Sequence, residues 1–106
     1  MTLDDSTAVI RGGKHWYWDH DSQPCSLDRW VQEFDNRMRI ETLVGDTWVV
    51  TAYLGMNDGN PLPPGEEPEA VFGTLVGRHR ELLSPTREHA VATHHAEVAR
   101  LREATP

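Results

Sequence analysis

The strongest structural pattern in this chain is the sequence Met-Arg-Ile-Glu-Thr-Leu-Val-Gly-Asp-Thr-Trp-Val-Val-Thr-Ala-Tyr-Leu-Gly, residues Met38–Gly55. Two runs rich in Val, Ile, Thr, Trp and Tyr flank the dipeptide Gly45-Asp46, and these residue types suit a pleated strand. Glycine reaches positive φ without a steric penalty, so the dipeptide predicts a two-residue hairpin turn. The turn fixes four cross-strand pairs: Val44 with Thr47, Leu43 with Trp48, Thr42 with Val49, and Ile40 with Thr51.

Both faces of this predicted hairpin are partly apolar. One face carries Ile40, Thr42, Val44, Val49, Thr51 and Tyr53. The other face carries Leu43, Trp48, Val50, Ala52 and Leu54, together with Arg39 and Glu41. This pattern favours a central hairpin that is covered by helices on one side and partly covered on the other.

Helices are predicted before and after the hairpin. Ser26 is a candidate N-cap for a helix from about Leu27 to Asn36. Its apolar stripe consists of Leu27, Trp30, Val31 and Phe34, and we expect this stripe to lie on the sheet. Thr86 is a candidate cap for a C-terminal helix. The apolar stripe of that helix consists of Ala90, Val91, His94, Val98 and Leu101.

The other segments predict strands and loops. Lys14–His20 is expected to be a strand with Trp16, Trp18 and His20 on one face, and Asp21–Ser26 is expected to be a turn. Gly55–Ala70 contains four prolines and predicts a long loop that is either functional or disordered. Val71–Val76 predicts a third strand of the meander, and Arg78–Leu83 predicts a short fourth strand at its edge.

Together these segments predict an α+β fold. A small antiparallel sheet of three to five strands packs with two helices in the order β-α-β-β-β-(β)-α. We expect residues 1–13 to be a flexible leader and residues 14–104 to be a single domain, which the length of 106 residues favours.

Composition and charge limit the functions open to the chain. A formal net charge of −7 argues against direct binding to nucleic acid. The single cysteine, Cys25, excludes an internal disulfide and fits a reducing compartment. The N-terminus lacks the pattern of a signal peptide, and no apolar run is long enough to span a bilayer. We therefore expect a cytoplasmic protein that is a monomer or a small homo-oligomer and has no membrane partner.

The distribution of charge predicts an acidic surface. Between Arg39 and Arg78 there is no Lys or Arg, whereas the same interval is rich in carboxylates. The candidate interaction surface consists of Asp46, Asp58, Glu66, Glu67 and Glu69. This surface is either a solvated face, or a docking face for a basic partner, or a mimic of nucleic acid phosphates.

The sequence carries no pattern that predicts a catalytic site, a metal site or a bound cofactor. His89 and His94 are five residues apart, whereas metal-binding pairs on a helix share a face at i, i+4. No activated nucleophile motif and no glycine-rich phosphate loop is present. The alternative of a small ligand, such as a nucleotide, would use Trp16, Trp18, Trp48 and Tyr53 as stacking walls, with His94 as a contact. Without a ligand, His94 is expected to be a core histidine bonded to a backbone carbonyl.

Three segments carry a resemblance: Trp48–Gly59, Phe72–Val76, and Thr86 followed by Ala90 and His94. In this order and at these spacings, the chain from roughly Leu27 to Val98 resembles a family of small uncharacterised proteins common in phages and prophages. In that family, Leu-Gly-Leu-Asp-His ends a strand, a Phe-Glu-Thr-Met-Val strand follows, and a Thr-capped helix contains Gly-His. Here Asn57-Asp58 replaces the Asp-His pair, Gly73 replaces the Glu and Thr93 replaces the Gly.

The resemblance implies a phage or prophage accessory protein with an αββ-type fold, and it implies no particular activity. The nine Arg against one Lys resemble the codon bias of a high-GC genome, which fits an actinobacterial host. We therefore expect a non-enzymatic module that binds a host protein through its acidic hairpin and loop surface.

Overall fold

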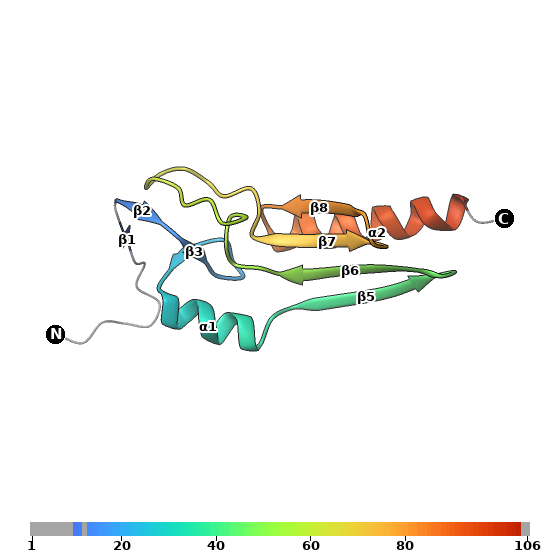
Figure 1. Cartoon of the computed structure of the whole chain (residues 1–106), viewed down its shortest axis with the longest axis horizontal. Helices are drawn as coiled ribbons and strands as arrows, with labels where there is room; N and C mark the ends of the chain where they lie inside the picture. The colour runs from blue at the N-terminus through green and yellow to red at the C-terminus, as the bar shows by residue number, and fades with distance from the viewer. Residues whose placement is uncertain (1–9, 12, 105–106) are drawn as a thin grey trace.

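The computed structural model describes residues 10–11 and 13–104, and it confirms the α+β class (Figure 1). The elements are β1 (Ile10–Arg11), β2 (Lys14–His15), β3 (Tyr17–Trp18), β4 (Pro24–Cys25), α1 (Leu27–Asp35), β5 (Arg39–Val44), β6 (Thr47–Tyr53), β7 (Phe72–Val76), β8 (Arg80–Ser84) and α2 (Arg87–Ala104). Strands β5 to β8 form an antiparallel meander in that order, while β1 pairs with β2 and β3 pairs with β4. Neither described helix has the length and apolarity needed to cross a membrane.

The hairpin of β5 and β6 has the register expected from its turn. All four expected cross-strand pairs are present, and Gly45 at the turn has a φ of 60°. Strand β7 extends the sheet by placing Phe72 opposite Tyr53, Thr74 opposite Thr51 and Val76 opposite Val49. Strand β8 begins at Arg80, two residues later than expected, because residues 77–79 form the turn that precedes it.

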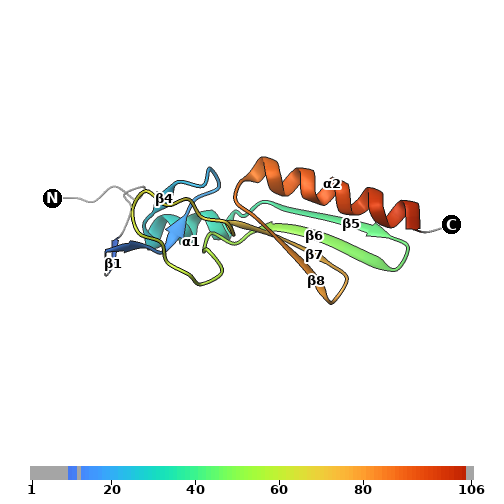
Figure 2. The ribbon, with the colours of Figure 1, turned by 90° about the horizontal axis from the view of Figure 1, so that it is seen from above.

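Helix α2 lies along one face of this four-stranded sheet (Figure 2). Thr86 caps it as expected, since the Thr86 Oγ1 accepts a hydrogen bond from the His89 N–H at 3.1 Å. Ala90, His94 and Val98 are buried at four-residue spacing. Residues four apart lie on one side of a helix, so successive turns of α2 contact successive levels of the sheet.

Two apolar clusters fill the space between α2 and the sheet. The aromatic cluster consists of Trp18, Tyr53, Val71, Phe72 and Ala90, with Trp30, Phe34, Met38 and Leu62 packed against it. The aliphatic cluster consists of Val44, Val49, Val76 and Val98, with Leu82 and Leu101 packed against it. Tyr53 and Val49 are four residues apart on β6, so the two clusters occupy opposite ends of one sheet face.

Helix α1 does not lie on the sheet, so the expectation for its apolar stripe was wrong. It packs beside β3, and Leu27 and Val31 remain 46% and 43% exposed. Only Trp30 and Phe34 reach the aromatic cluster, and the Trp30 Nε1 donates a hydrogen bond to the Leu54 carbonyl at 3.0 Å. The 18-residue α2 already covers the inner face of the sheet, so the nine-residue α1 is placed at the end of the sheet.

The N-terminal segments also differ from expectation. Lys14–His20 is not one strand, because the chain divides at Trp16 into β2 and β3. The expected turn Asp21–Ser26 includes β4, in which Cys25 lies opposite Tyr17. Of the expected leader, residues 1–9 and 12 lie outside the described residues, whereas Ile10–Arg11 pair with β2.

The long loop between β6 and β7 is held at two points. The Asn57 Oδ1 accepts hydrogen bonds from the N–H groups of Glu69 and Ala70, at 2.9 and 3.1 Å. His15 and Leu62 exchange two backbone hydrogen bonds, at 2.8 and 3.0 Å. The loop is therefore an ordered part of the fold and lies over the N-terminal strands.

Candidate functional site: an acidic cleft

Three segments that are distant in sequence meet beside the start of α2 and enclose a cleft of about 350 Å³. They are the turn before β4, the part of the long loop around Glu66, and the link from β8 to α2. The carboxylates that line this acidic cleft are Asp21, Glu66 and Glu67, and its apolar walls include Pro24, Pro68 and Pro85. Among the described residues that line it, no Lys, Arg or His is present.

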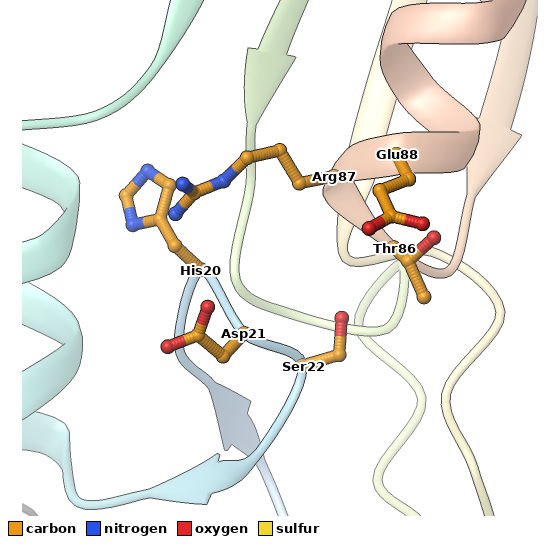
Figure 3. A pocket seen from close by; sticks show the side chains of 6 residues that line it. All are labelled: His20, Asp21, Ser22, Thr86, Arg87 and Glu88. Atoms are coloured by element: carbon orange, nitrogen blue, oxygen red, sulfur yellow. The ribbon is translucent and has the colours of Figure 1, made fainter.

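A second cavity, of about 380 Å³, continues from the acidic cleft along the start of α2 (Figure 3). The two share Asp21, Ser22 and Thr86 as lining residues. His20, Arg87 and Glu88 complete the second cavity, and in Figure 3 the Arg87 side chain extends from the start of α2 toward His20. Basic groups thus begin where the acidic cleft ends.

The turn that carries Asp21 is held by its own side chains. The Asp19 Oδ1 accepts hydrogen bonds from the N–H groups of Asp21 and Gln23, at 2.9 and 3.0 Å. Ser22 has a φ of 61°, a left-handed conformation that is uncommon outside glycine. The Ser22 Oγ donates to the Pro85 carbonyl at 2.5 Å and so joins the turn to the link before α2. This bond across 63 residues fixes one wall of the acidic cleft against another.

His20 and Glu33 form a histidine–carboxylate pair in which both ring nitrogens of His20 have partners within the fold. The His20 Nε2 accepts the Met38 N–H at 3.0 Å, so the ring proton lies on Nδ1, 3.3 Å from the Glu33 carboxylate. The same carboxylate accepts the His20 backbone N–H at 3.0 Å. Burial raises the pKa of Glu33, but the hydrogen bonds from His20 outweigh that effect and hold it below its usual 4.5. This pair ties the turn to α1 and leaves no ring nitrogen of His20 for catalysis.

Other groups that could act as nucleophiles are buried. Cys25 is 2% exposed, and burial raises the pKa of its thiol to about 12. Burial likewise raises the pKa of Tyr53, whose hydroxyl donates to the Trp18 carbonyl at 2.6 Å. Ser84 bonds to the His89 Nδ1 at 2.9 Å, but Ser84 is fully buried. Each of these side chains is placed to support the fold and not to meet a substrate.

His94 is a core histidine, but its partners differ from the expected backbone carbonyl. Its Nε2 and Nδ1 each lie 2.8 Å from a threonine hydroxyl, of Thr42 and Thr51 respectively. Thr51 in turn lies 2.7 Å from the Thr74 Oγ1, so a polar chain crosses three strands inside the core. His94 is 1% exposed, and burial, followed by the charge of His95, lowers its pKa.

The expected acidic surface divides into two places. Glu66 and Glu67 line the acidic cleft, while Asp58 and Glu69 belong to the same loop outside it. Asp46 is at the turn between β5 and β6, separated from that loop by the whole length of β6, roughly 20 Å. The structure therefore does not bring Asp46 together with the other four residues. A stretch of sequence without Lys or Arg does not have to form one continuous surface in the folded chain.

The four expected aromatic walls do not face a common cavity. Trp18 and Tyr53 are 1% and 0% exposed in the aromatic cluster, where Tyr53 stacks on His20 at 3.9 Å between ring centroids. Trp16 is half-buried in the segment between β2 and β3. Trp48 is 49% exposed on the sheet face opposite α2. Alternation along β6 places Trp48 and Tyr53 on opposite faces, so the two cannot stack on one ligand.

Sequence reasoning missed several residues of the site. Asp21, Ser22 and Pro85 reach the acidic cleft only because the turn and the link before α2 meet in space. Outside the site, it also missed the ion pairs of Glu97, which is 4% exposed and pairs with Arg80 and Arg100. Hydrogen bonding from Arg100 and then from Arg80 holds the pKa of Glu97 below its usual 4.5, despite its burial. Among the described residues, no three side chains of His, Cys, Asp or Glu converge as a metal site.

Comparison with protein families, with curated proteins and with solved structures finds no match to this chain.

Proposed function

We propose that this chain is a non-enzymatic protein-interaction module that binds a basic segment of a partner protein in the acidic cleft. The observation that carries the proposal is the lining of that cleft, in which Asp21, Glu66 and Glu67 meet proline walls without a basic side chain. The resemblance to phage and prophage proteins supports a host protein in the host cytoplasm as the partner.

A lysine or arginine side chain suits this cleft for two physical reasons. Its cationic head would be attracted by three carboxylates, of which Glu66 and Glu67 line only this cleft, whereas Asp21 also lines the adjoining cavity with Arg87. Its aliphatic stem would pack on Pro24, Pro68 and Pro85. Complementary charge of this kind increases the association rate and selects the partner, and added salt weakens it.

The reactive side chains are bonded within the fold or buried, and this supports a binding role rather than catalysis. Both ring nitrogens of His20 and of His94 have partners within the fold. Cys25 and Ser84 are buried. A catalytic base or nucleophile has to reach its substrate, and these groups do not.

The test uses charge reversal with a matched control. Labelled peptides that carry Lys or Arg between neutral residues are titrated against the wild type and against Glu66→Lys/Glu67→Lys, with binding followed by fluorescence anisotropy. We expect the variant to bind at least tenfold more weakly, because two of three attractive charges become repulsive. The control, Asp46→Lys/Glu103→Lys, makes the same change of net charge at the other end of the sheet, and it should bind within a factor of about two.

Two results would contradict the proposal. Equal losses in both variants would mean that the peptides respond to net charge and not to the acidic cleft. No binding of any basic peptide to well-folded wild type would remove the basic segment as ligand. Once a peptide binds, affinity capture from a high-GC bacterial lysate identifies the natural partner as a protein retained by the control variant and lost from the cleft variant.

A further inference from the structure

A third cavity, of about 410 Å³, lies between α1 and the start of α2. It shares His20, Asp21 and Arg87 with the second cavity, which in turn adjoins the acidic cleft. The charged residues that line the third cavity are Asp21, Arg29, Glu33 and Arg87. The character of the lining therefore changes along these three adjoining spaces, from carboxylates and prolines at one end to a pair of arginines at the other.

The two arginines of the third cavity are not engaged by the fold. Arg29 belongs to α1, and Arg87 is the first residue of α2. Within the described residues neither guanidinium takes part in an ion pair, whereas Arg39, Arg80 and Arg100 each do. The Arg29 Nε is also buried and has no hydrogen-bond acceptor in the part of the chain that the structure describes. Buried donors in proteins are nearly always paired, so this unpaired nitrogen indicates that an acceptor is expected beside Arg29.

The two carboxylates of the third cavity have other partners. The Glu33 Oε1 accepts the His20 backbone N–H at 3.0 Å and lies 3.3 Å from the His20 Nδ1. Asp21 also lines the acidic cleft, in which the basic side chain of the partner segment would bind. Two arginines and two carboxylates balance in the third cavity itself. A cation bound at Asp21 adds one positive charge, and a single carboxylate would compensate it.

We propose that the third cavity is a carboxylate subsite, in which an Asp or Glu side chain of the bound segment lies between Arg29 and Arg87. The guanidinium group suits this ligand, because its planar array of N–H donors binds a carboxylate through two parallel hydrogen bonds. A phosphate dianion suits the subsite less well, since Asp21 and Glu33 line the same cavity and would repel the second negative charge. This inference rests on the proposed function, because the segment held in the acidic cleft presents the carboxylate.

The carboxylate subsite would make the chain selective among basic segments. A segment with a basic and an acidic residue in the matching order satisfies both ends of the three spaces. A segment with basic residues only would bring a second cation toward Arg29 and Arg87, and a segment with the reverse order would bring its carboxylate toward Glu66 and Glu67. Repulsion of this kind discriminates between partners that share the same attractive contact.

Labelled peptides test the carboxylate subsite by fluorescence anisotropy. In a neutral peptide with one Lys, a Glu is placed in turn at each of the four positions before and after the Lys, and Gln at the same position gives the reference. At one spacing or more, the Glu peptide should bind the wild type at least tenfold more tightly than its Gln reference, because charge-assisted pairs of this type are among the stronger hydrogen bonds in proteins. Phosphoserine at the same position should bind less tightly than Glu.

Substitutions of the two arginines connect this preference to the third cavity. Arg87→Gln and Arg29→Gln should each remove most of the preference for Glu, and neither should weaken binding of the Gln reference. Arg87→Glu should reverse the preference, a result that a merely structural role of Arg87 would not produce. The matched control is Arg102→Gln, which makes the same change of charge in the last turn of α2 and should keep the tenfold preference. Arg87 is exposed in the first turn of α2, where a cation opposes the helix dipole, so its replacement should leave the chain folded.

The outcomes separate this inference from the proposed function. If the Gln references bind through Glu66 and Glu67 but Glu adds nothing at any spacing, or adds as much in both arginine variants, the carboxylate subsite is overturned and the proposed function stands. If a peptide with Glu and no Lys binds as tightly as the best Lys–Glu peptide, and Arg87→Gln abolishes that binding, the subsite is supported and the proposed function is contradicted. Tighter binding of phosphoserine than of Glu would overturn the carboxylate as the ligand, and failure of every peptide to bind the folded wild type would overturn both proposals.

Discussion

The two apolar clusters lie on the same sheet face under the same helix, yet they are assembled differently. The aliphatic cluster uses only the four-stranded meander and α2, elements that neighbour one another in the sheet in their order along the chain. The aromatic cluster also gathers β3, α1 and the long loop, whose contributions come from Trp18, Trp30 and Leu62. The first is a regular sheet–helix core, whereas the second is the place where irregular segments are held together.

Polar groups separate the two clusters further. At the aromatic cluster, the rings also carry hydrogen-bonding groups. Tyr53 donates to the Trp18 carbonyl. His20 stacks on Tyr53 and also bonds to Glu33 and Met38. Beside the aliphatic cluster, the buried polar side chain is the carboxylate of Glu97, which pairs with Arg80 and Arg100 and not with a ring. Aromatic side chains therefore allow a short sheet to organise segments that lack regular structure, since one ring offers both a large apolar surface and a polar tip. The acidic cleft lies at this end of the molecule.

The largest effect is expected from removing a ring at the aromatic end. Phe72→Ala should lower the free energy of unfolding by about 3–5 kcal/mol, because it leaves a large cavity and unties Tyr53 and His20, whose rings contact Phe72 edge-on. The matched change in the same strand, Val76→Ala, removes fewer atoms from the aliphatic cluster and should cost about 2 kcal/mol. Urea denaturation measures both values.

The two variants should also differ in where the damage spreads. Hydrogen exchange should show faster opening of β3, β4 and α1 in Phe72→Ala, whereas Val76→Ala should leave these segments protected. Equal protection of β3 and α1 in the two variants would show that the aromatic cluster does not hold the irregular segments.

The second effect contrasts two glycines of the central hairpin. A Cβ at Gly55, where φ is 74°, would lie 2.4 Å from the Trp30 ring and 2.3 Å from the Tyr53 hydroxyl. A Cβ at Gly45, where φ is 60°, would meet nothing within 4 Å. Gly55→Ala should therefore cost about 2–4 kcal/mol, from left-handed strain together with overpacking, and Gly45→Ala about 1–2 kcal/mol, from strain alone.

Thermal denaturation of the two alanine variants measures this contrast. Fluorescence adds a local readout, because the clash at Gly55 acts directly on Trp30. If Gly55→Ala cost no more than Gly45→Ala, close packing of α1 against the end of β6 would be wrong.

The sequence was sufficient for the meander and α2 for a physical reason. The Gly45-Asp46 turn sets the register, and period-two alternation then assigns every residue of β5 and β6 to a face. Thr86 and the four-residue spacing of Ala90, His94 and Val98 likewise define α2 by local rules. These features depend on neighbours in sequence, which pattern analysis detects.

The candidate site could be predicted only in part, because its geometry is not local. The long loop was identified as a candidate from its prolines, and Glu66 and Glu67 do line the acidic cleft. Their companion Asp21 comes from a turn more than 40 residues earlier, and a single hydrogen bond from Ser22 to Pro85 brings that turn to α2. The placement of α1 failed for a similar reason. Its stripe of Trp30 and Phe34 predicts that one side of the helix is buried, but it does not predict the surface against which that side packs.

The smallest effect concerns His94, which stands between the two clusters. The folded state binds a proton on His94 only at a pH below the usual pKa of 6.5, because the site is buried beside His95. The unfolded chain takes up that proton near pH 6.5, so the unfolded state binds more protons as the pH falls. The contribution of neutral His94 to the free energy of unfolding is therefore fully present above pH 6.5, and it is lost as the pH falls toward the lowered pKa. The slope from this one group cannot exceed about 1.4 kcal/mol per pH unit.

Urea midpoints from pH 7.5 to pH 5 measure this slope in the wild type and in His94→Gln, which can keep a hydrogen bond to Thr51 but does not titrate. We expect the variant to be less stable at pH 7.5 and to lose less stability on acidification. The control is His79→Gln, at an exposed position in the turn before β8, which should retain the wild-type slope. Parallel curves for His94→Gln and the wild type would mean that another group causes the acid sensitivity. A flatter curve would assign it to the polar chain of His94, Thr51 and Thr74 that joins the aromatic and aliphatic ends of the core.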